Sequence, residues 1–328
     1  MRMMVYSARA YDESTLERAN AGAHTLTYVP VKLDTTTVGL ASGYEAVCCF
    51  VNDVLSADVL ALLAAGGTRL VTLRCTGYNN LDLAAAQRHG ITAMRVSSYS
   101  PYSVAEFAVG LLQTLNRRIH RAYTRNREFA FVLDGFMGRD LHGQTVGVVG
   151  TGKIGAIFAG IMRGFGCDVL AYDVVQNEAC LAQGVRYTGL DDLIASSDII
   201  SLHVPLFPET KYLIDATSLA RMRPRALLIN TSRGGLVDTA ALIDALQRGA
   251  IGGVALDVYE DEAGVFFNDL SGTTARDASL SVLMSFPNVL VTSHQAFFTE
   301  EAMATIAETT IGNLTDFATG RDNANKIM

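Results

Sequence analysis

The chain has 328 residues, of which 49% are hydrophobic and 18% charged, and its formal net charge is −7. This length suffices for two domains with separate cores, and the composition is too apolar for a disordered chain. The negative charge argues against a nucleic-acid partner, because a phosphate backbone would be repelled, and any anionic ligand would need arginines gathered locally.

Cysteine usage and the chain's beginning bear on the compartment. The five cysteines include no C-x-x-C pair, so neither a disulfide framework nor a metal site is expected. The first residues lack the apolar run and cleavage site of a signal peptide, and no run reaches the roughly 18 apolar residues of a membrane span. We therefore predict a cytoplasmic protein without a membrane partner.

In the first hundred residues short apolar runs alternate with helical patterns, which is typical of a parallel sheet with helical crossovers. Strands are predicted at 4–7, 46–51, 70–74 and 92–95. Ser100 and Pro101 then form a helix start, with a capping residue followed by proline. The helix is expected to run to about residue 122 and is apolar around most of its girth, so it lies at a domain junction or at a subunit interface.

A more regular alternation begins at Gln144. Six strands with intervening helices are expected, at 145–150, 168–173, 199–204, 226–231, 253–259 and 288–292. This pattern predicts a doubly wound dinucleotide-binding domain. A long polar segment, 261–279, precedes the last strand and is expected to be functional or mobile. A final helix, 300–319, has no place in a six-stranded domain and is predicted to return to the N-terminal domain.

The sequence Gly-Thr-Gly-Lys-Ile-Gly at 150–155 links a predicted strand to a predicted helix. Gly150 permits a tight turn, Gly152 lets backbone N–H groups approach a pyrophosphate, and Gly155 lets helix and strand pack closely. Asp173 ends the next strand, where a carboxylate accepts hydrogen bonds from ribose hydroxyls and repels the additional phosphate of NADP. NAD is therefore the predicted cofactor; a glycine-rich turn in another nucleotide fold, such as a methyltransferase, is the alternative.

Three polar residues follow late strands, where an open α/β sheet places its ligands. Arg233 can bind a carboxylate bidentately, and His294 is the natural proton donor near neutral pH. Glu262 would orient that imidazole and favour its charged form, although spacing alone does not separate it from Glu260. Singly, such an arginine is more often part of a surface ion pair and such a histidine a structural group; together they indicate reduction of a keto acid.

Over essentially its whole length the chain resembles the D-isomer-specific 2-hydroxyacid dehydrogenases, and most closely their bacterial fermentative D-lactate branch. The glycine motif already described is one of the stretches that carry the resemblance. The others are Leu73–Asn80, Tyr99–Glu106, His203-Val204-Pro205 with Thr210, Asn230–Gly234, Asp257–Glu262 and Thr292–Phe297.

The resemblance implies particular roles for residues in these stretches. The family's pattern Asp-x-aromatic-x-x-Glu selects Glu262 beside Arg233 and His294 as catalytic residues. It implies a substrate site that includes Thr76, Gly77, Tyr99, Arg233, His294 and Phe297. It implies a cofactor site made of Gly150, Gly152, Lys153, Ile154, Gly155, Asp173, Val204, Pro205, Thr231, Ser232 and Asp257.

We therefore expect two doubly wound parallel-sheet domains with a cleft between them. A flavodoxin-like substrate domain would comprise 1–100 and 299–328, and a Rossmann NAD-binding domain 101–298. The expected reaction is that of an NAD-dependent D-lactate dehydrogenase in fermentation, pyruvate and NADH giving D-lactate, in a homo-oligomer (dimer or tetramer). The alternatives are a dehydrogenase for a bulkier D-2-hydroxy acid and a non-catalytic NAD(H)-sensing protein.

Overall fold

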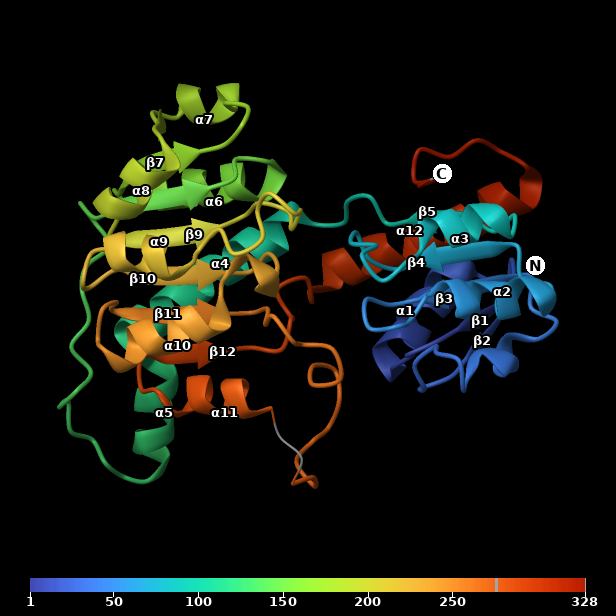
Figure 1. Ribbon diagram of the computed structural model, residues 1–328, viewed down its shortest axis with the longest axis horizontal. Helices are drawn as coiled ribbons and strands as arrows, with labels where there is room; N and C mark the ends of the chain where they lie inside the picture. The colour runs from blue at the N-terminus through green and yellow to red at the C-terminus, as the bar shows by residue number, and fades with distance from the viewer. Residues whose placement is uncertain (275–276, 328) are drawn as a thin grey trace. The chain divides into compact units, whose positions relative to one another are not determined.

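The computed structural model describes residues 1–274 and 277–327 (Figure 1). The chain divides into two compact units, each built around one parallel sheet. The first unit is Met1–Ser100 with Phe298–Met328, and the second is Pro101–Phe297. The predicted fold class, two parallel-sheet α/β units, is thereby confirmed.

The first unit contains a five-stranded parallel sheet in the flavodoxin-like order β2-β1-β3-β4-β5. Its strands are β1 (Arg2–Val5), β2 (Thr25–Tyr28), β3 (Ala46–Cys49), β4 (Leu70–Leu73) and β5 (Thr92–Arg95). The sequence did not predict β2, because this edge strand is half exposed and alternates threonine with larger residues instead of forming an apolar run.

Helices cover both faces of the first sheet. They are α1 (Ala10–Asn20), α2 (Ala57–Ala65), α3 (Leu83–Arg88) and α12 (Glu300–Thr319), with a 3₁₀ turn at Val38–Ala41. Leu16 of α1 and Leu314 of α12 share one core, and Leu60 of α2 lies in the other. As expected from the sequence, α12 (red in Figure 1) returns to this unit, where it packs against α1 and β4.

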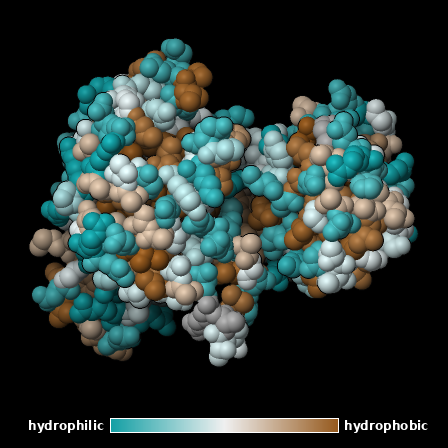
Figure 2. All heavy atoms as spheres, in the orientation of Figure 1, coloured by the Kyte–Doolittle hydropathy of each residue, from teal (hydrophilic) through white to brown (hydrophobic). Residues whose placement is uncertain are grey.

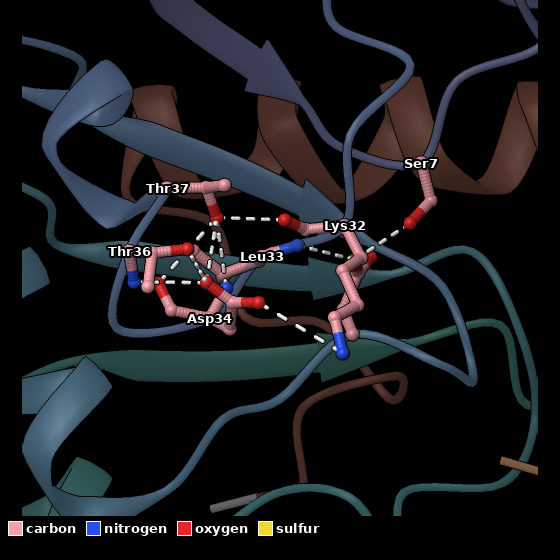
Figure 3. Close-up of polar contacts among 7 residues, drawn as sticks. Ser7, Lys32, Leu33, Asp34, Thr36 and Thr37 are labelled. Carbon is pink, nitrogen blue, oxygen red and sulfur yellow. Dashed lines mark hydrogen bonds and ion pairs between the residues drawn. The ribbon is translucent and has the colours of Figure 1, made fainter. Parts of the chain in front are cut away.

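The carboxyl edge of the first sheet is closed by polar contacts with the loop that follows β2. Figure 3 shows this loop, in which the Thr37 hydroxyl donates to the Lys32 carbonyl (2.6 Å) and the Thr36 backbone N–H to Asp34 Oδ1 (2.8 Å). The loop is tied to β3's end because the Leu33 N–H donates to Asp53 Oδ1 at 2.8 Å. Ser7 Oγ donates to the same oxygen at 2.7 Å.

Beside Asp53 lies a buried arginine. Arg74, 3% exposed, extends from β4 and donates through Nε to Asp12 Oδ1 (3.2 Å) and through Nη2 to the Ser7 carbonyl (2.9 Å). Its guanidinium also lies over the Phe50 ring, 4.9 Å from the centroid. Burial lowers the pKa of Arg74, but the neighbouring Asp12 carboxylate and other anionic groups raise it more, so the net shift is upward. The ends of β1, β3 and β4 are thus held together by an ionic network.

The second unit contains a seven-stranded parallel sheet in the order β12-β11-β10-β9-β6-β7-β8. Its strands are β6 (Thr145–Val149), β7 (Asp168–Tyr172), β8 (Arg186–Tyr187), β9 (Ile199–Leu202), β10 (Leu227–Asn230), β11 (Gly253–Leu256) and β12 (Val289–Val291). Six of them match the predicted strands. The prediction of only six was wrong, since the edge strand β8 has two residues and thus no periodicity to detect.

Helices cover both faces of this sheet as well. They are α4 (Pro101–Arg117), α5 (Ile119–Arg127), α6 (Lys153–Gly164), α7 (Glu178–Ala182), α8 (Leu190–Ser196), α9 (Ala216–Arg221), α10 (Thr239–Gln247) and α11 (Ala278–Ser285), with a 3₁₀ turn at Gly234–Leu236. α4, α6 and α7 share one core with the sheet, and α8 to α11 share the other. The single helix predicted to run from 101 to about 122 is interrupted at Arg118, whose φ of 53° is left-handed and redirects the chain.

Candidate active site

The glycine turn joins β6 to α6, as the sequence predicted. Gly150 has φ +94°, and a Cβ there would lie 2.8 Å from the His203 carbonyl carbon. A Cβ on Gly155 would lie 1.9 Å from the Gly150 oxygen, whereas one on Gly152 would meet nothing within 4 Å. Two glycines therefore allow close packing, and the third leaves open space in front of the α6 N-terminus, where Lys153 and Ile154 begin the helix.

Asp173 holds this turn in place from the end of β7. Its Oδ2 accepts a hydrogen bond from the Thr151 backbone N–H (2.6 Å), and its Oδ1 accepts one from the Val174 N–H (2.7 Å). Tyr187 Oη also donates to Thr151 Oγ1 at 2.8 Å. The carboxylate thus lies beside the glycine turn, where a ribose contact requires it.

The ends of β9 and β10 form the other side of the predicted cofactor site. Ser232 Oγ donates to the Val204 carbonyl at 2.6 Å, which joins the two strand ends next to Pro205. Thr231 is 7% exposed, and its Oγ1 has no hydrogen-bond partner within the described residues. A buried hydroxyl without a partner is stabilised when a ligand forms a hydrogen bond with it. The backbone N–H groups at the α6 N-terminus favour an anion in the open space at the glycine turn. These residues fit NAD, the cofactor predicted from the sequence.

Arg233 follows β10 at the start of the Gly234–Leu236 turn. The Asn230 side chain fixes its backbone by donating to the Arg233 carbonyl at 2.8 Å, while Arg233 Nη1 donates to the Ser232 carbonyl at 2.7 Å. A Cβ on Gly234 would lie 2.0 Å from the Tyr259 carbonyl carbon, so only glycine permits the close approach of the β10 and β11 ends. The guanidinium is half-buried and retains donors for a carboxylate.

His294 and Glu262 are brought together although they lie 32 residues apart. His294 Nδ1 is 3.0 Å from Glu262 Oε1, and the two side chains are 17% and 27% exposed. The other oxygen, Glu262 Oε2, accepts the Tyr259 backbone N–H at 3.3 Å. Glu260 instead accepts hydrogen bonds from the Tyr212 hydroxyl and the Thr239 N–H. The geometry therefore pairs Glu262, and not Glu260, with His294 Nδ1, so that the ring nitrogen Nε2 faces away from this carboxylate.

The loop carrying His294 is fixed by Asp257, which is completely buried. Its Oδ1 accepts hydrogen bonds from Thr292 Oγ1 (2.6 Å) and the Gln295 N–H (3.0 Å), and its Oδ2 accepts the Ala296 N–H (2.8 Å). His294 has φ 55°, an uncommon left-handed conformation for a non-glycine residue. Burial raises the pKa of Asp257 although these hydrogen bonds oppose the shift. Its contact with the cofactor stays a prediction, while its contact with the histidine loop is observed.

The polar segment 261–279 contributes an aromatic residue that the sequence analysis missed. The Phe267 ring lies 5.9 Å from the His294 ring, and Phe266 is buried against Tyr259. Two consecutive phenylalanines in an otherwise polar segment were the available signal. Residues 275–276 of the segment lie outside the described residues.

The remaining predicted substrate residues fall in both units. In the first unit Thr76 and Gly77 follow β4, and the Thr76 carbonyl accepts a hydrogen bond from Arg95 Nη1 at 2.9 Å. Tyr99 lies in the same unit, next to its end at Ser100. In the second unit Phe297 follows His294 by three residues and is half-buried. Their contact with a substrate stays a prediction.

Two features bear on metals and membranes. Within residues 1–274 and 277–327, no three histidine, cysteine, aspartate or glutamate side chains are grouped as metal ligands. Within the same ranges, no helix combines the length and hydrophobicity needed to cross a membrane.

Comparison with known proteins gives consistent matches. The family model described as "D-isomer specific 2-hydroxyacid dehydrogenase, NAD binding domain" matches residues 109–296. The chain is 51% identical to 2-hydroxyacid dehydrogenase A of Aspergillus oryzae, covering 100% of this chain and 95% of that protein. It is 43% identical to D-lactate dehydrogenase of Escherichia coli over 100% of both chains. A solved structure from work identifying the pyruvate reductase of Chlamydomonas reinhardtii is 44% identical, covers 99% and 98% of the two chains, and has a TM-score of 0.95.

Proposed function

Because this chain belongs to the D-isomer-specific 2-hydroxyacid dehydrogenases and is an NAD-dependent oxidoreductase, we propose that it reduces pyruvate with NADH to D-lactate. Full-length relatives named D-lactate dehydrogenase support this choice of substrate, as does the structural neighbour described as a pyruvate reductase. Fermentation in the cytoplasm is part of the same proposal. Its support is that the five cysteines are buried and none is joined in a disulfide, as expected in a reducing compartment.

One observation carries the proposal: the His294–Glu262 pair, with 3.0 Å between Nδ1 and Oε1, follows strands β12 and β11 while Arg233 follows the adjacent β10. A proton donor, the carboxylate that orients it and a guanidinium therefore come from three neighbouring strand ends of one sheet. Reduction of a 2-keto acid needs a proton at the carbonyl oxygen and a positive group for the carboxylate. This set of residues provides both.

In the proposed mechanism, Arg233 binds the substrate carboxylate through two parallel hydrogen bonds. His294 protonated at Nε2 gives that proton to the carbonyl oxygen as the keto group becomes a hydroxyl. Glu262 holds Nδ1 and stabilises the charged ring before transfer. Asp257 keeps the histidine loop in its left-handed conformation. We propose that substrate binding also involves Thr76, Gly77, Tyr99 and Phe297, as the family resemblance implies.

For the cofactor, we propose that the residues predicted from the sequence hold it. The open space at Gly152 and the α6 N-terminus would hold the pyrophosphate, and Asp173 a ribose. Bound NADH supplies the hydride. Val204, Pro205, Thr231 and Ser232 would hold the other half of the dinucleotide, and the unpartnered Thr231 hydroxyl supports that assignment.

The test is loss of NADH absorbance with purified protein and pyruvate, phenylpyruvate, 2-ketoisocaproate or hydroxypyruvate, repeated with NADPH. We expect the highest kcat/KM with pyruvate and NADH, and a product oxidised only by a D-specific enzyme. Preference for a bulkier keto acid would replace pyruvate as the substrate and leave the mechanism intact. Tight NADH binding without turnover of any substrate would favour a sensing protein.

We also propose that the protein is a homo-oligomer, a dimer or tetramer. The loop after α5 exposes large hydrophobic side chains, among them Phe129 (84%), Phe131 (69%) and Leu133 (83%). Figure 2 shows hydrophobic side chains at the surface over α5 and this loop, at the lower left. A patch of this kind is typical of a protein interface, and a second copy is the occupant we propose. Light scattering coupled to gel filtration tests it; a monomer at micromolar concentration would overturn the proposal.

A further inference from the structure

At the amino edge of the second sheet lies a cavity of about 120 Å³ that the proposed function does not use. It is bounded by the C-terminal end of α4, the loop before β6 and the segments that lead into β10, β11 and β12. Its lining residues are Leu115, Asn116, Arg118, Met137, Gly138, Arg139, Arg225, Leu227, Gly252, Pro287 and Asn288. The glycine turn, Arg233 and His294 all follow strands at the carboxyl edge, so this cavity is separate from the candidate active site.

Three arginines line this small space. Arg118, Arg139 and Arg225 come from three segments far apart in the sequence, and none of them has an acidic side chain within 4.0 Å in the described parts of the chain. The neighbouring carboxylate, Asp198, already pairs with Arg223 at 2.8 Å. In a chain with a net charge of −7, this is a local concentration of positive charge that Asp198 balances only in part.

Arg139 is held in place by contacts with Asn116 and with the backbone of Arg225. Arg139 Nη2 donates to the Arg225 carbonyl at 2.7 Å, and the Asn116 side chain, 8% exposed, bonds both the N–H and the carbonyl of Arg139 (3.1 and 2.7 Å). Arg118 has the left-handed conformation that interrupts the helix between α4 and α5. A non-glycine residue in that conformation costs free energy, which the surrounding structure must offset.

The pKa of Arg139 reflects the positive charge around it. Burial and the nearby Arg225 guanidinium lower the pKa of Arg139, and Asp198 only partly opposes them. The protein therefore keeps a cation in a place where its charged form is disfavoured. An anion bound between the guanidinium groups would reverse that cost.

We propose that this arginine cavity is a binding site for a phosphate-class oxyanion. Guanidinium groups bind such oxyanions through paired, charge-assisted hydrogen bonds, and the cavity admits a compact group of a few atoms but no nucleotide. Inorganic phosphate and the phosphate group of a small monoester share this chemistry. The site would give the enzyme a response to phosphate that is independent of the catalytic residues.

The experiment is calorimetric titration of the NADH-saturated enzyme, in which the cofactor occupies the glycine turn. Sodium phosphate and glycerol 3-phosphate are titrated separately at constant ionic strength. We expect one site per chain, with affinity reduced by about tenfold or more in Arg139→Gln/Arg225→Gln, because each lost charge-assisted hydrogen bond corresponds to at least about that factor. A higher affinity for glycerol 3-phosphate than for phosphate would identify a monoester as the ligand, and the reverse would identify the free ion.

The matched control is Arg221→Gln/Arg248→Gln, which removes two exposed arginines of the same unit that pair with Asp191 and Asp244. It should bind phosphate as the original protein does. The single variant Arg225→Gln, at an exposed position, tests the site if the double variant does not fold. No phosphate binding, equal weakening in both double variants, or phosphate that competes with pyruvate and binds the cavity variant normally would overturn the proposal.

Discussion

The carboxyl edges of the two sheets have the same parallel topology but opposite chemistry. In the first unit, Arg74, Asp12, Asp53 and Ser7 bond to one another and close the edge with buried charges. In the second unit, glycines stand at the 150–155 turn where larger side chains would not fit or would fill the open space. The Thr231 hydroxyl has no protein partner in the described residues. The same topology thus provides an edge linked by buried charged groups in one unit and an edge with an open glycine turn in the other; the side chains at the strand ends decide which.

The strongest test of the open edge is His294→Gln. Loss of the proton donor should reduce kcat by about 10²- to 10⁴-fold, because general acid catalysis contributes that factor. NADH affinity and unfolding temperature should remain unchanged, since the imidazole is partly exposed and holds no strand end. Steady-state kinetics measures kcat, and calorimetry measures the NADH affinity and the unfolding temperature. A kcat within a few-fold of the original would remove His294 from the mechanism.

Arg74→Met tests the ionic network at the carboxyl edge of the first sheet. Removing the cation leaves Asp12 without its buried partner, and the free energy of unfolding of the first unit should fall by about 3–5 kcal/mol. Urea unfolding measures the loss in unfolding free energy, and hydrogen exchange shows whether the loss is confined to the first unit. Arg69→Met is the control, because Arg69 is 64% exposed in its pair with Glu45 and should cost no more than about 1 kcal/mol. Equal losses in the two variants would show that the Arg74 network is not special.

Arg233→Lys tests substrate binding at the open edge with the charge retained. A lysine cannot form two parallel hydrogen bonds to a carboxylate, so kcat/KM for pyruvate should fall by about 10- to 100-fold. NADH affinity should be unaffected. Arg221→Lys, at an exposed ion pair on α9, is the matched control and should behave like the original protein. Unaltered kinetics in Arg233→Lys would argue that this guanidinium does not bind the substrate.

The last prediction concerns a group behind the glycine turn. The His203 ring packs against Phe158 and bonds Ser201, both fully buried, and burial lowers the pKa of His203 from 6.5 to about 3. Between pH 6.5 and about 3, the unfolded chain therefore binds a proton at His203 that the folded chain does not bind. This contribution to stability is complete above pH 6.5 and is lost as the pH falls towards 3.

His203→Gln should remove that part of the acid sensitivity. The unfolding free energy of the original protein minus that of the variant, measured by urea titration between pH 7 and 4, should therefore decrease as the pH falls. A constant difference across this range would show that the histidine takes up its proton over the same pH range in the folded and unfolded states.

Local sequence signals were sufficient for much of the protein. The glycine turn, the six longer strands of the second sheet and helix α12 could all be predicted, and Arg233 and His294 were singled out as candidate site residues. Each depends on periodicity or on a short motif whose physical requirement is met by neighbouring residues. From the sequence, the choice of Glu262 over Glu260 depended on the family resemblance. A spacing of two residues within a loop does not show which side chain points towards the histidine.

The tertiary structure decided what depends on distant partners. Strands β2 and β8 exist because a sheet edge offers them hydrogen bonds, not because their sequences are apolar. The left-handed conformation of His294 depends on Asp257, 37 residues earlier, and the Phe267 ring reaches His294 only through the folded 261–279 segment. Likewise, the three arginines of the phosphate-class cavity come together only in the fold. Sequence determined the chemistry available at each strand end, whereas contacts between distant segments determined which groups meet, since their geometry is fixed only once the cores have packed.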